Sequence, residues 1–193
     1  MPDSDVSLVR MTLAGRVSAF GELLRRHGPA IHAYLQRRSS RDSADDLLSE
    51  VFLRAYAAVR HYDERWQDAR PWLYGIARNV LREHHRQGHA PLADWARFTH
   101  AVSVDDPWPD VDSRLDATAR NSSLRRALAS LAPADREVLL LVTWEGLTPA
   151  QAAVSLGIPQ GTARSRLFRA RAAMRDLLSD DAAAQAATNY TEA

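Results

Sequence analysis

The sequence contains no cysteine and no lysine. Without cysteine, disulfide scaffolds, thiolate zinc sites and cysteine nucleophiles are excluded, so the core must hold the fold unaided. No apolar run approaches the roughly 18 residues that a membrane-spanning helix needs. The first residues, MPDSDVSLVRM, lack the basic start and long apolar stretch of a signal peptide. We therefore expect a soluble cytoplasmic protein with no membrane insertion.

Charge is nearly balanced over the whole chain but not along it. All 25 basic residues are arginine, 24 residues are acidic, and the formal net charge is +1. Residues 124–178 hold eight arginines and four acids, whereas residues 103–123 hold five acids and two arginines. Guanidinium groups suit contacts with phosphate and guanine. The local distribution of charge, not its total, therefore indicates where nucleic acid would bind.

Apolar residues recur at spacings of three and four along most of the chain, which predicts an all-α protein. Proline, glycine and aspartate interrupt this pattern between the two halves. We expect two small helical domains, over residues 1–90 and 121–179, joined by a flexible acidic linker over 91–120 and followed by a disordered tail over 180–193. The expected helices cover residues 6–14, 17–27, 29–39, 43–60, 71–86, 121–131, 134–144, 148–156 and 160–178.

The segment TPAQAAVSLGIPQGTARSRLFRARAAM has the pattern of a helix-turn-helix. Thr148 can cap a helix that has Pro149 at its first position. Gly157 supplies the left-handed turn, and a second helix starts near Gln160.

The second helix of this segment has an apolar face and an arginine-rich face. Its inward residues are Ala163, Leu167, Ala170 and Met174. The candidate DNA-contacting residues are Gly161, Thr162, Arg164, Ser165, Arg166, Arg169 and Arg171. Arginine reads guanine bidentately, serine bonds base or phosphate, and the helix N-terminus attracts phosphate. An ordinary solvated face on an αα-hairpin is the alternative interpretation.

In the N-terminal half, SADDLLSEVFLRAYAAVRHY predicts a helix with Ser43 as N-cap and one continuous apolar stripe. Outside that stripe lie Asp46, Glu50, Leu53 and Arg54. An exposed leucine among charges suits docking to a partner helix, although a solvated face is also possible.

The following loop and helix combine aromatic rings with basic side chains. The helix that begins near Pro71 carries Arg78, Asn79 and Arg82 outward. The rings nearby are Tyr62, Trp66, Trp72 and Tyr74. Rings beside arginines are typical of single-stranded DNA binding, and core packing explains the same rings equally well.

Three strings, DDLLSEVFLRAY, ARPWLYGIARNVL and GTARSRLFRARAAMR, resemble in order and spacing the extracytoplasmic-function sigma factors of bacterial RNA polymerase. The first two are similar to conserved region two and the third to the second part of region four. The resemblance covers roughly residues 17–88 and 121–178. It implies a protein that recognises promoters, needs no cofactor and catalyses nothing by itself.

The resemblance also implies partners for each set of residues. Asp46, Glu50, Leu53 and Arg54 would dock on the clamp helices of the largest subunit of core RNA polymerase, and region four would meet the flap of the second-largest subunit. The implied minus-ten contacts are Tyr62, Asp63, Trp66, Arg78, Asn79 and Arg82. The helix-turn-helix residues named above would read the minus-thirty-five element, and an anti-sigma factor is an implied regulator.

Two positions depart from the family pattern: Ser49 stands where glutamine is frequent, and Gly75 where a basic residue is frequent. Because of these two departures, the resemblance does not define the contacts that positions 49 and 75 make.

Two other functions compete with this interpretation. A helix-turn-helix repressor or activator would bind duplex DNA without polymerase. A metal-assisted hydrolase would use Glu83 with His84, His85 and His89. The sequence has no H-E-x-x-H, no G-x-S-x-G and no glycine-rich phosphate loop, so we expect no metal site and no enzymatic activity.

Overall fold

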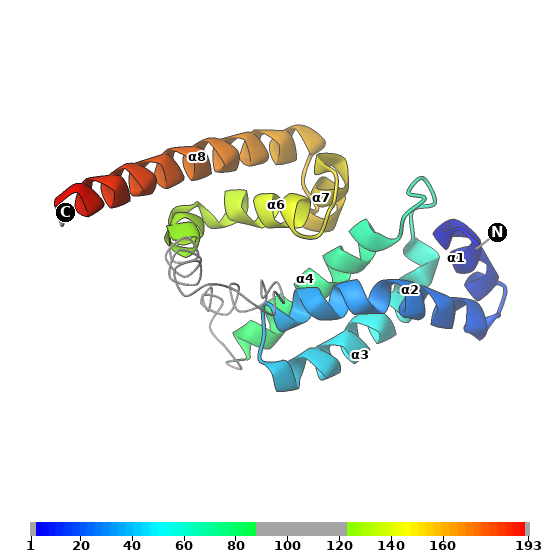
Figure 1. Cartoon of the computed structure of the whole chain (residues 1–193). Helices are drawn as coiled ribbons and strands as arrows, with labels where there is room; N and C mark the ends of the chain where they lie inside the picture. Colours follow the sequence, from blue (N-terminus) through cyan, green and yellow to red (C-terminus); the bar gives the residue numbers. More distant parts are fainter. Residues whose placement is uncertain (1–2, 88–122, 192–193) are drawn as a thin grey trace. The chain divides into compact units, whose positions relative to one another are not determined.

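The structure is a computed structural model that describes residues 3–87 and 123–191, and these two ranges contain helices and connections but no strand. This confirms the all-α prediction (Figure 1). A helix over residues 123–130 precedes α6. The expected linker over 91–120 lies outside the described residues. The other elements are α1 (Asp5–Leu13), α2 (Val17–Gln36), α3 (Arg41–Ala58), the 3₁₀ turn η1 (Val59–His61), α4 (Arg70–Arg86), α6 (Pro133–Thr143), α7 (Pro149–Leu156) and α8 (Gln160–Thr191).

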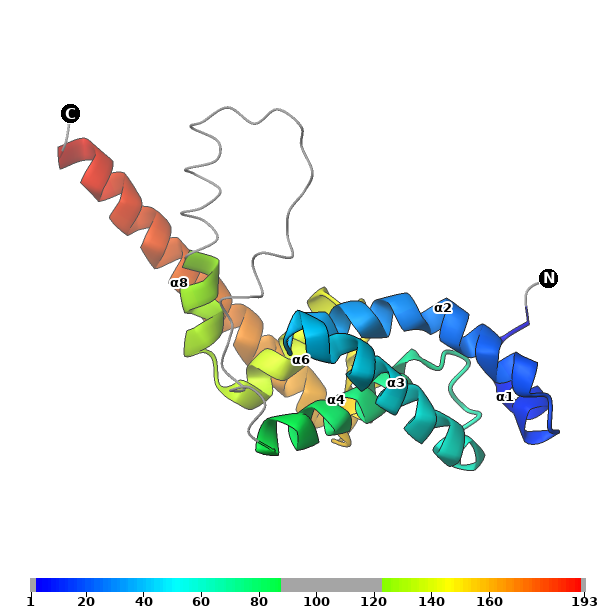
Figure 2. The ribbon, with the colours of Figure 1, turned by 90° about the horizontal axis from the view of Figure 1, so that it is seen from below.

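Contacts divide the chain into two compact units, Met1–Asp94 with Ala150–Pro159 and Trp95–Pro149 with Gln160–Ala193. In the first unit, α2 packs against α1, α3 and α4, and α3 also packs against α4 (Figure 2). The core between them includes Leu23, Ile31, Leu35 and Leu73, each at most 1% exposed. None of the described helices is long and apolar enough to cross a membrane.

Helix α2 is longer than predicted, because it runs unbroken through Gly28 and Pro29, where we expected one helix to end and another to begin. Proline removes one backbone donor and usually interrupts a helix. Pro29 is exposed, however, so solvent can satisfy the carbonyl that loses its partner. Leu23 and Ile31 continue the buried stripe on both sides of the proline. Packing of that stripe therefore keeps the helix continuous despite the helix-breaking tendency of Gly28 and Pro29.

Helix α3 begins earlier than predicted. Its N-cap is Ser40, whose Oγ accepts a hydrogen bond from the Ser43 backbone nitrogen at 3.2 Å. The prediction of Ser43 as N-cap was therefore wrong by one turn. Both serines fit the capping chemistry, and their hydroxyl oxygens lie 2.6 Å apart.

Within the first unit, α7 lies against the start of α4. Ser155 Oγ donates a hydrogen bond to the Pro71 carbonyl at 2.8 Å. A Cβ atom added to Gly75 would lie 3.3 Å from the Ser155 carbonyl oxygen. Glycine at position 75 thus permits this close approach, which gives a structural account of one departure from the family pattern.

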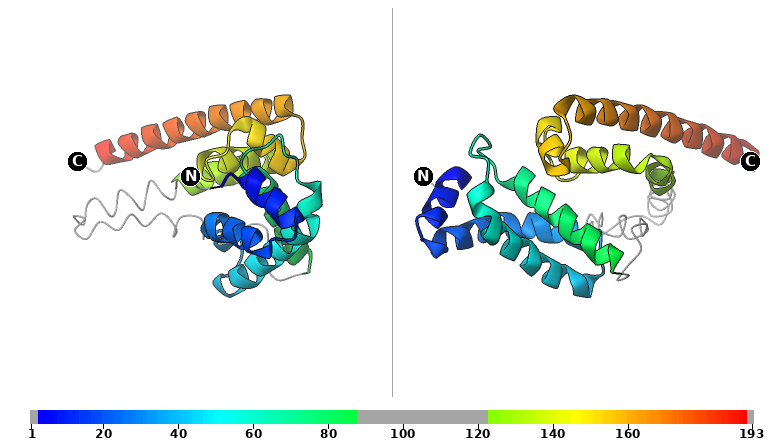
Figure 3. Two further views of the ribbon diagram at one scale, coloured as in Figure 1. Left: turned by 90° about the vertical axis from the view of Figure 1, so that its right-hand side faces the viewer. Right: turned by 180° about the vertical axis from the view of Figure 1, so that it is seen from behind.

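In the second unit, α6 and α8 lie side by side (Figures 1 and 3). Ala163, Leu167 and Ala170 face inward, as predicted, while Met174 is half-buried. Helix α8 continues to Thr191, through residues that we expected to form a disordered tail from position 180. Alanine has the highest helix propensity of all residues, and several alanines in this stretch explain the extension.

Candidate nucleic-acid and polymerase interfaces

The first half of α8 presents a polar face opposite its buried alanines and leucine. Two of the seven predicted DNA-contacting residues, Thr162 and Arg166, are half-buried. The other five are exposed: Gly161, Arg164, Ser165, Arg169 and Arg171. Phe168, on the same outward face, is 75% exposed. A Cβ added to Gly161 would meet no atom within 4 Å, so the first turn of the helix is open to a close approach. This face offers guanidinium groups, a hydroxyl and a ring to a ligand.

Arg169 is held by a carboxylate of α6, which sequence reasoning missed. Its Nε and Nη2 donate hydrogen bonds to Asp135 Oδ2 and Oδ1, at 2.9 and 2.7 Å. The arginine side chain is 59% exposed and that of Asp135 only 12%. The pairing with Asp135 raises the pKa of Arg169. This fork uses one edge of the guanidinium group and leaves Nη1 and one proton of Nη2 for a ligand.

A second candidate site is a hollow of about 440 Å³ between α3 and α4. It brings together two of the residues predicted to contact the minus-ten element, Asn79 and Arg82, which are both exposed. Arg78, predicted with them, is half-buried and does not line it. The lining residues are Arg54, Ala58, Ile76, Asn79, Arg82, Glu83 and Arg86. A lining that combines cationic and amide groups with the apolar side chains of Ala58 and Ile76 suits a planar base attached to a phosphate.

Arg54 belongs to this hollow, although we predicted that it would face polymerase. Its guanidinium group bonds Glu50 of its own helix at 2.6 Å and Glu83 of α4 at 2.7 Å. The hydrogen bond from Arg54 lowers the pKa of Glu83. Arg54 is thus held between Glu50 of α3 and Glu83 of α4, and its side chain remains 39% exposed.

The outer face of α3 is acidic and apolar. Four exposed residues follow one another along this face at helical spacings of three and four: Asp46, Ser49, Leu53 and Tyr56. Leu53 is 66% exposed and Tyr56 44%. We call these four residues the α3 stripe. It contains two of the four residues predicted to bind polymerase.

Contacts within the loop between η1 and α4, residues 62–69, help to order it. Tyr62 is buried, its ring lies edge-on to Trp72 with centroids 5.3 Å apart, and its hydroxyl donates to the Trp66 carbonyl. Burial raises the pKa of Tyr62. Asp63 accepts hydrogen bonds from Arg65, which lower its pKa. Tyr62 therefore supports the loop from inside, while Trp66 is half-exposed.

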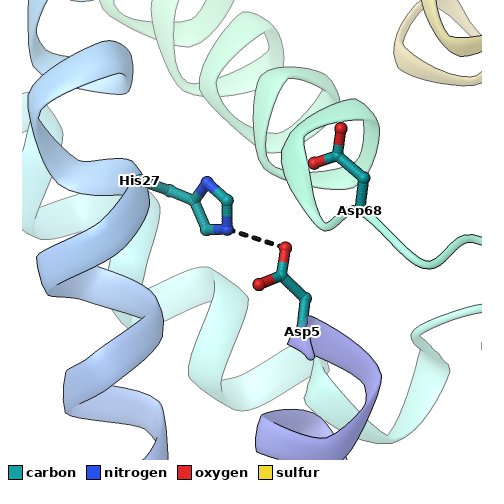
Figure 4. A group of neighbouring side chains, drawn as sticks. All are labelled: Asp5, His27 and Asp68. Carbon is teal, nitrogen blue, oxygen red and sulfur yellow. Dashed lines mark hydrogen bonds and ion pairs between the residues drawn. The ribbon is translucent and has the colours of Figure 1, made fainter. Parts of the chain in front are cut away.

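Sequence reasoning gave no sign of a cluster of Asp5, His27 and Asp68, of which the first two are buried and Asp68 is half-buried (Figure 4). One ligand atom from each residue lies within 4.8 Å of the others, as a metal site requires. The oxygens of Asp5 already accept hydrogen bonds from Arg26, His27 and the Ala69 backbone. Asp68 is paired with Arg70 at 2.8 Å. Two guanidinium groups balance the two carboxylates, so the cluster works as a hydrogen-bonded tie between helices.

The pKa of Asp5 reflects this tie. Burial alone would raise it, but hydrogen bonds from His27, the Ala69 backbone and Arg26 outweigh burial and lower the pKa to about 2. Because the carboxylate stays ionised and only accepts, His27 Nε2 is the donor in the 2.8 Å bond.

The residues considered for a metal-assisted hydrolase lie on α4 or outside the described residues. His84 and His85 are adjacent on α4, with ring centroids 5.8 Å apart. Glu83 is engaged by Arg54, and His89 lies outside the described residues.

Both units are helical, and their exposed arginines form surfaces that suit contact with DNA. The family model for Sigma-70 region 2 matches residues 23–90, and that for Sigma-70 region 4 matches residues 122–174. The chain therefore belongs to the sigma factors of bacterial RNA polymerase, in the extracytoplasmic-function group, a family of transcription regulators.

Individual relatives agree with this membership. The sigma factor SigC of Mycobacterium tuberculosis is 38% identical over 72% of this chain and 72% of its own length. NccH of Alcaligenes xylosoxydans xylosoxydans is 30% identical over 92% of this chain and 96% of its own length. SigE of Mycolicibacterium smegmatis is 31% identical over 83% of this chain, which spans 62% of that relative.

Solved structures are similar as well. CnrH, solved in complex with the cytosolic domain of CnrY, has a TM-score of 0.63 and 27% identity, covering 93% of this chain and 99% of CnrH. The sigma factor RpoE of Bartonella quintana, solved with the anti-sigma factor NepR, has a TM-score of 0.54 and 24% identity, and shares the fold over 83% of this chain and 96% of its own.

Proposed function

We propose that this chain directs core RNA polymerase to promoters through three surfaces and catalyses no reaction itself. The outward face of α8 reads the minus-thirty-five element, the α3–α4 hollow with loop 62–69 binds the minus-ten element, and the α3 stripe docks on the polymerase clamp. The observation that carries the proposal is the exposed face of α8, where Arg164, Ser165 and Phe168 lie opposite a buried apolar side.

At the minus-thirty-five element, α8 would lie in the major groove with its N-terminal turn against a phosphate. Arginine forms bidentate bonds to the O6 and N7 atoms of guanine, and an apolar ring suits a thymine methyl group. Gly161 leaves space for the backbone to approach the phosphate. These contacts select duplex sequence before any strand separation.

At the minus-ten element, the hollow would take an unstacked base. Asn79 offers both a donor and an acceptor to a base edge, and Arg82 and Arg86 suit the adjoining phosphates. Unstacking a base costs a few kcal/mol, and binding the extruded base offsets that cost. Strand opening then needs no hydrolysis, since binding alone shifts the equilibrium between duplex and open DNA.

The α3 stripe would provide the protein contact. An exposed leucine and tyrosine beside a serine and an aspartate form an apolar centre with a polar edge, which suits a helix-docking surface. A regulatory protein that covers these surfaces would prevent both contacts. The complexes of CnrH with CnrY and of RpoE with the anti-sigma factor NepR support an anti-sigma partner for this chain.

The test is run-off transcription with sigma-free bacterial core polymerase on a promoter library. We expect sequence-selective transcripts that depend on this chain. Arg164→Ala should lose about 1–3 kcal/mol of discrimination at one base of the upstream element. The matched control is Arg175→Ala, three turns further along α8, which removes the same exposed charge beyond the proposed contact region.

Three results would count against the proposal in different ways. Tight binding to duplex DNA without polymerase, and no stimulation of transcription, would favour a repressor. Equal effects of Arg164→Ala and Arg175→Ala would remove the specific role of the outward face of α8. An unchanged opening rate in Asn79→Ala would remove the hollow from promoter melting.

A further inference from the structure

Helix α1 precedes the residues matched by the region 2 model, which begin at position 23. It packs against α2 and η1 and lies beside the segment that leads into α4 (Figures 1 and 2). That segment contains loop 62–69, to which we assigned minus-ten contacts. Helix α1 is therefore placed to hold the loop while lying outside the surfaces proposed to bind DNA.

Asp5, at the start of α1, ties three segments together. Its Oδ2 accepts hydrogen bonds from the Ala69 backbone nitrogen and from His27 Nε2, both at 2.8 Å. Its Oδ1 accepts from Arg26 Nη1 at 2.6 Å. The Asp5 side chain is only 6% exposed. A buried carboxylate with these partners fixes the end of the loop where α4 begins; its bond with His27 is drawn in Figure 4.

A second tie from α1 reaches the middle of the loop. Arg10 donates from Nη2 and Nε to Glu64 Oε2, at 2.6 and 3.2 Å. Both side chains are substantially exposed, so the pair adds little to global stability. Its geometry nevertheless restricts the part of the loop between Asp63 and Trp66.

We propose that α1 braces loop 62–69 through Asp5 and Arg10, and that both act as positioning residues for binding the minus-ten element. A loop that is already ordered pays less conformational entropy when it binds DNA. This inference rests on the proposed function of the loop. It adds that affinity for the opened strand is set partly by side chains that touch no DNA.

The experiment measures binding of the assembled holoenzyme to a fluorescent single-stranded oligonucleotide that carries the minus-ten sequence. Arg10→Ala should weaken this binding roughly three- to tenfold, the factor expected from freeing one or two ordered side chains. Affinity for core polymerase and thermal stability should stay as in the wild type. Asp5→Asn should weaken binding at least as much. The control Arg25→Ala breaks a similar exposed pair with Glu22 on α2 and should bind like the wild type.

Hydrogen exchange of the amides of residues 63–69 in the free protein provides a readout that needs no DNA. Exchange should accelerate in Asp5→Asn and Arg10→Ala but not in Arg25→Ala. Unchanged exchange in both α1 variants, or unchanged oligonucleotide binding despite faster exchange, would overturn the inference. If the wild-type holoenzyme failed to select the minus-ten strand, the proposed function would fail, while the exchange data would still show whether α1 braces the loop.

Discussion

The buried Asp5 makes a quantitative prediction about acid stability. Asp5→Asn keeps the shape of the side chain but removes its charge and its capacity to accept from three donors at once. The comparison of interest is the free energy of unfolding of the wild type and of this variant as the pH is lowered.

The pKa of Asp5 is about 2 in the folded chain, against an ordinary value of 3.8. A folded-state pKa below the unfolded one adds stability above the unfolded value, and this stability is lost as the pH falls through the folded value. Each pKa unit corresponds to about 1.4 kcal/mol. The wild type should therefore lose about 2 kcal/mol more than Asp5→Asn between pH 5 and pH 2.

Urea unfolding followed by circular dichroism at several pH values measures this difference. Asp3→Asn, which removes an exposed acid two residues earlier, controls for the change in net charge. A constant gap between wild type and Asp5→Asn from pH 5 to pH 2 would refute the reasoning. It would mean that the hydrogen bonds to Asp5 do not favour its ionised form.

Three further predictions concern other parts of the chain. Asp135→Ala should change base preference at the promoter position read by Arg169, with other positions unaffected in a promoter-library selection; a uniform loss at all positions would argue against an orienting role. Leu53→Ala should weaken binding to core polymerase by about 1–2 kcal/mol in a titration and leave the unfolding free energy within about 0.5 kcal/mol, because the side chain is largely exposed. Gly157→Ala should destabilise the protein by about 1 kcal/mol in urea unfolding, since Gly157 has a φ of +64° and its Cβ would meet no atom within 4 Å; no loss of stability would show that the turn relaxes.

Most of the fold was predictable because the apolar spacing is regular. The expected helices over 71–86, 134–144 and 148–156 differ from the observed α4, α6 and α7 by about one residue at either end. The errors occurred where local signals compete with packing. Gly28 and Pro29 suggest a break, yet the buried stripe of α2 crosses them. Ser40 and Ser43 lie one helical turn apart and share the same capping chemistry, so the local sequence does not distinguish which of them caps α3.

The candidate sites were less predictable, because their geometry depends on contacts between distant residues. Helical spacing located the outward face of α8, but not the carboxylate of Asp135, which is 34 positions from Arg169. Nothing in the sequence indicated that Arg54, predicted to bind polymerase, would also pair with Glu83 of α4. Likewise, the hydrogen bond from the Ala69 backbone to Asp5 joins residues that are 64 positions apart.

The pairing of Arg169 with Asp135 has a consequence for how promoter preference can diverge. Under the proposed function, the angle at which Arg169 meets a base depends on a residue of another helix. A substitution at position 135 would retune the preferred promoter while every side chain on the DNA-facing surface stayed the same. Two sigma factors with identical recognition helices can thus control different sets of genes, and comparison of those helices alone would miss the difference.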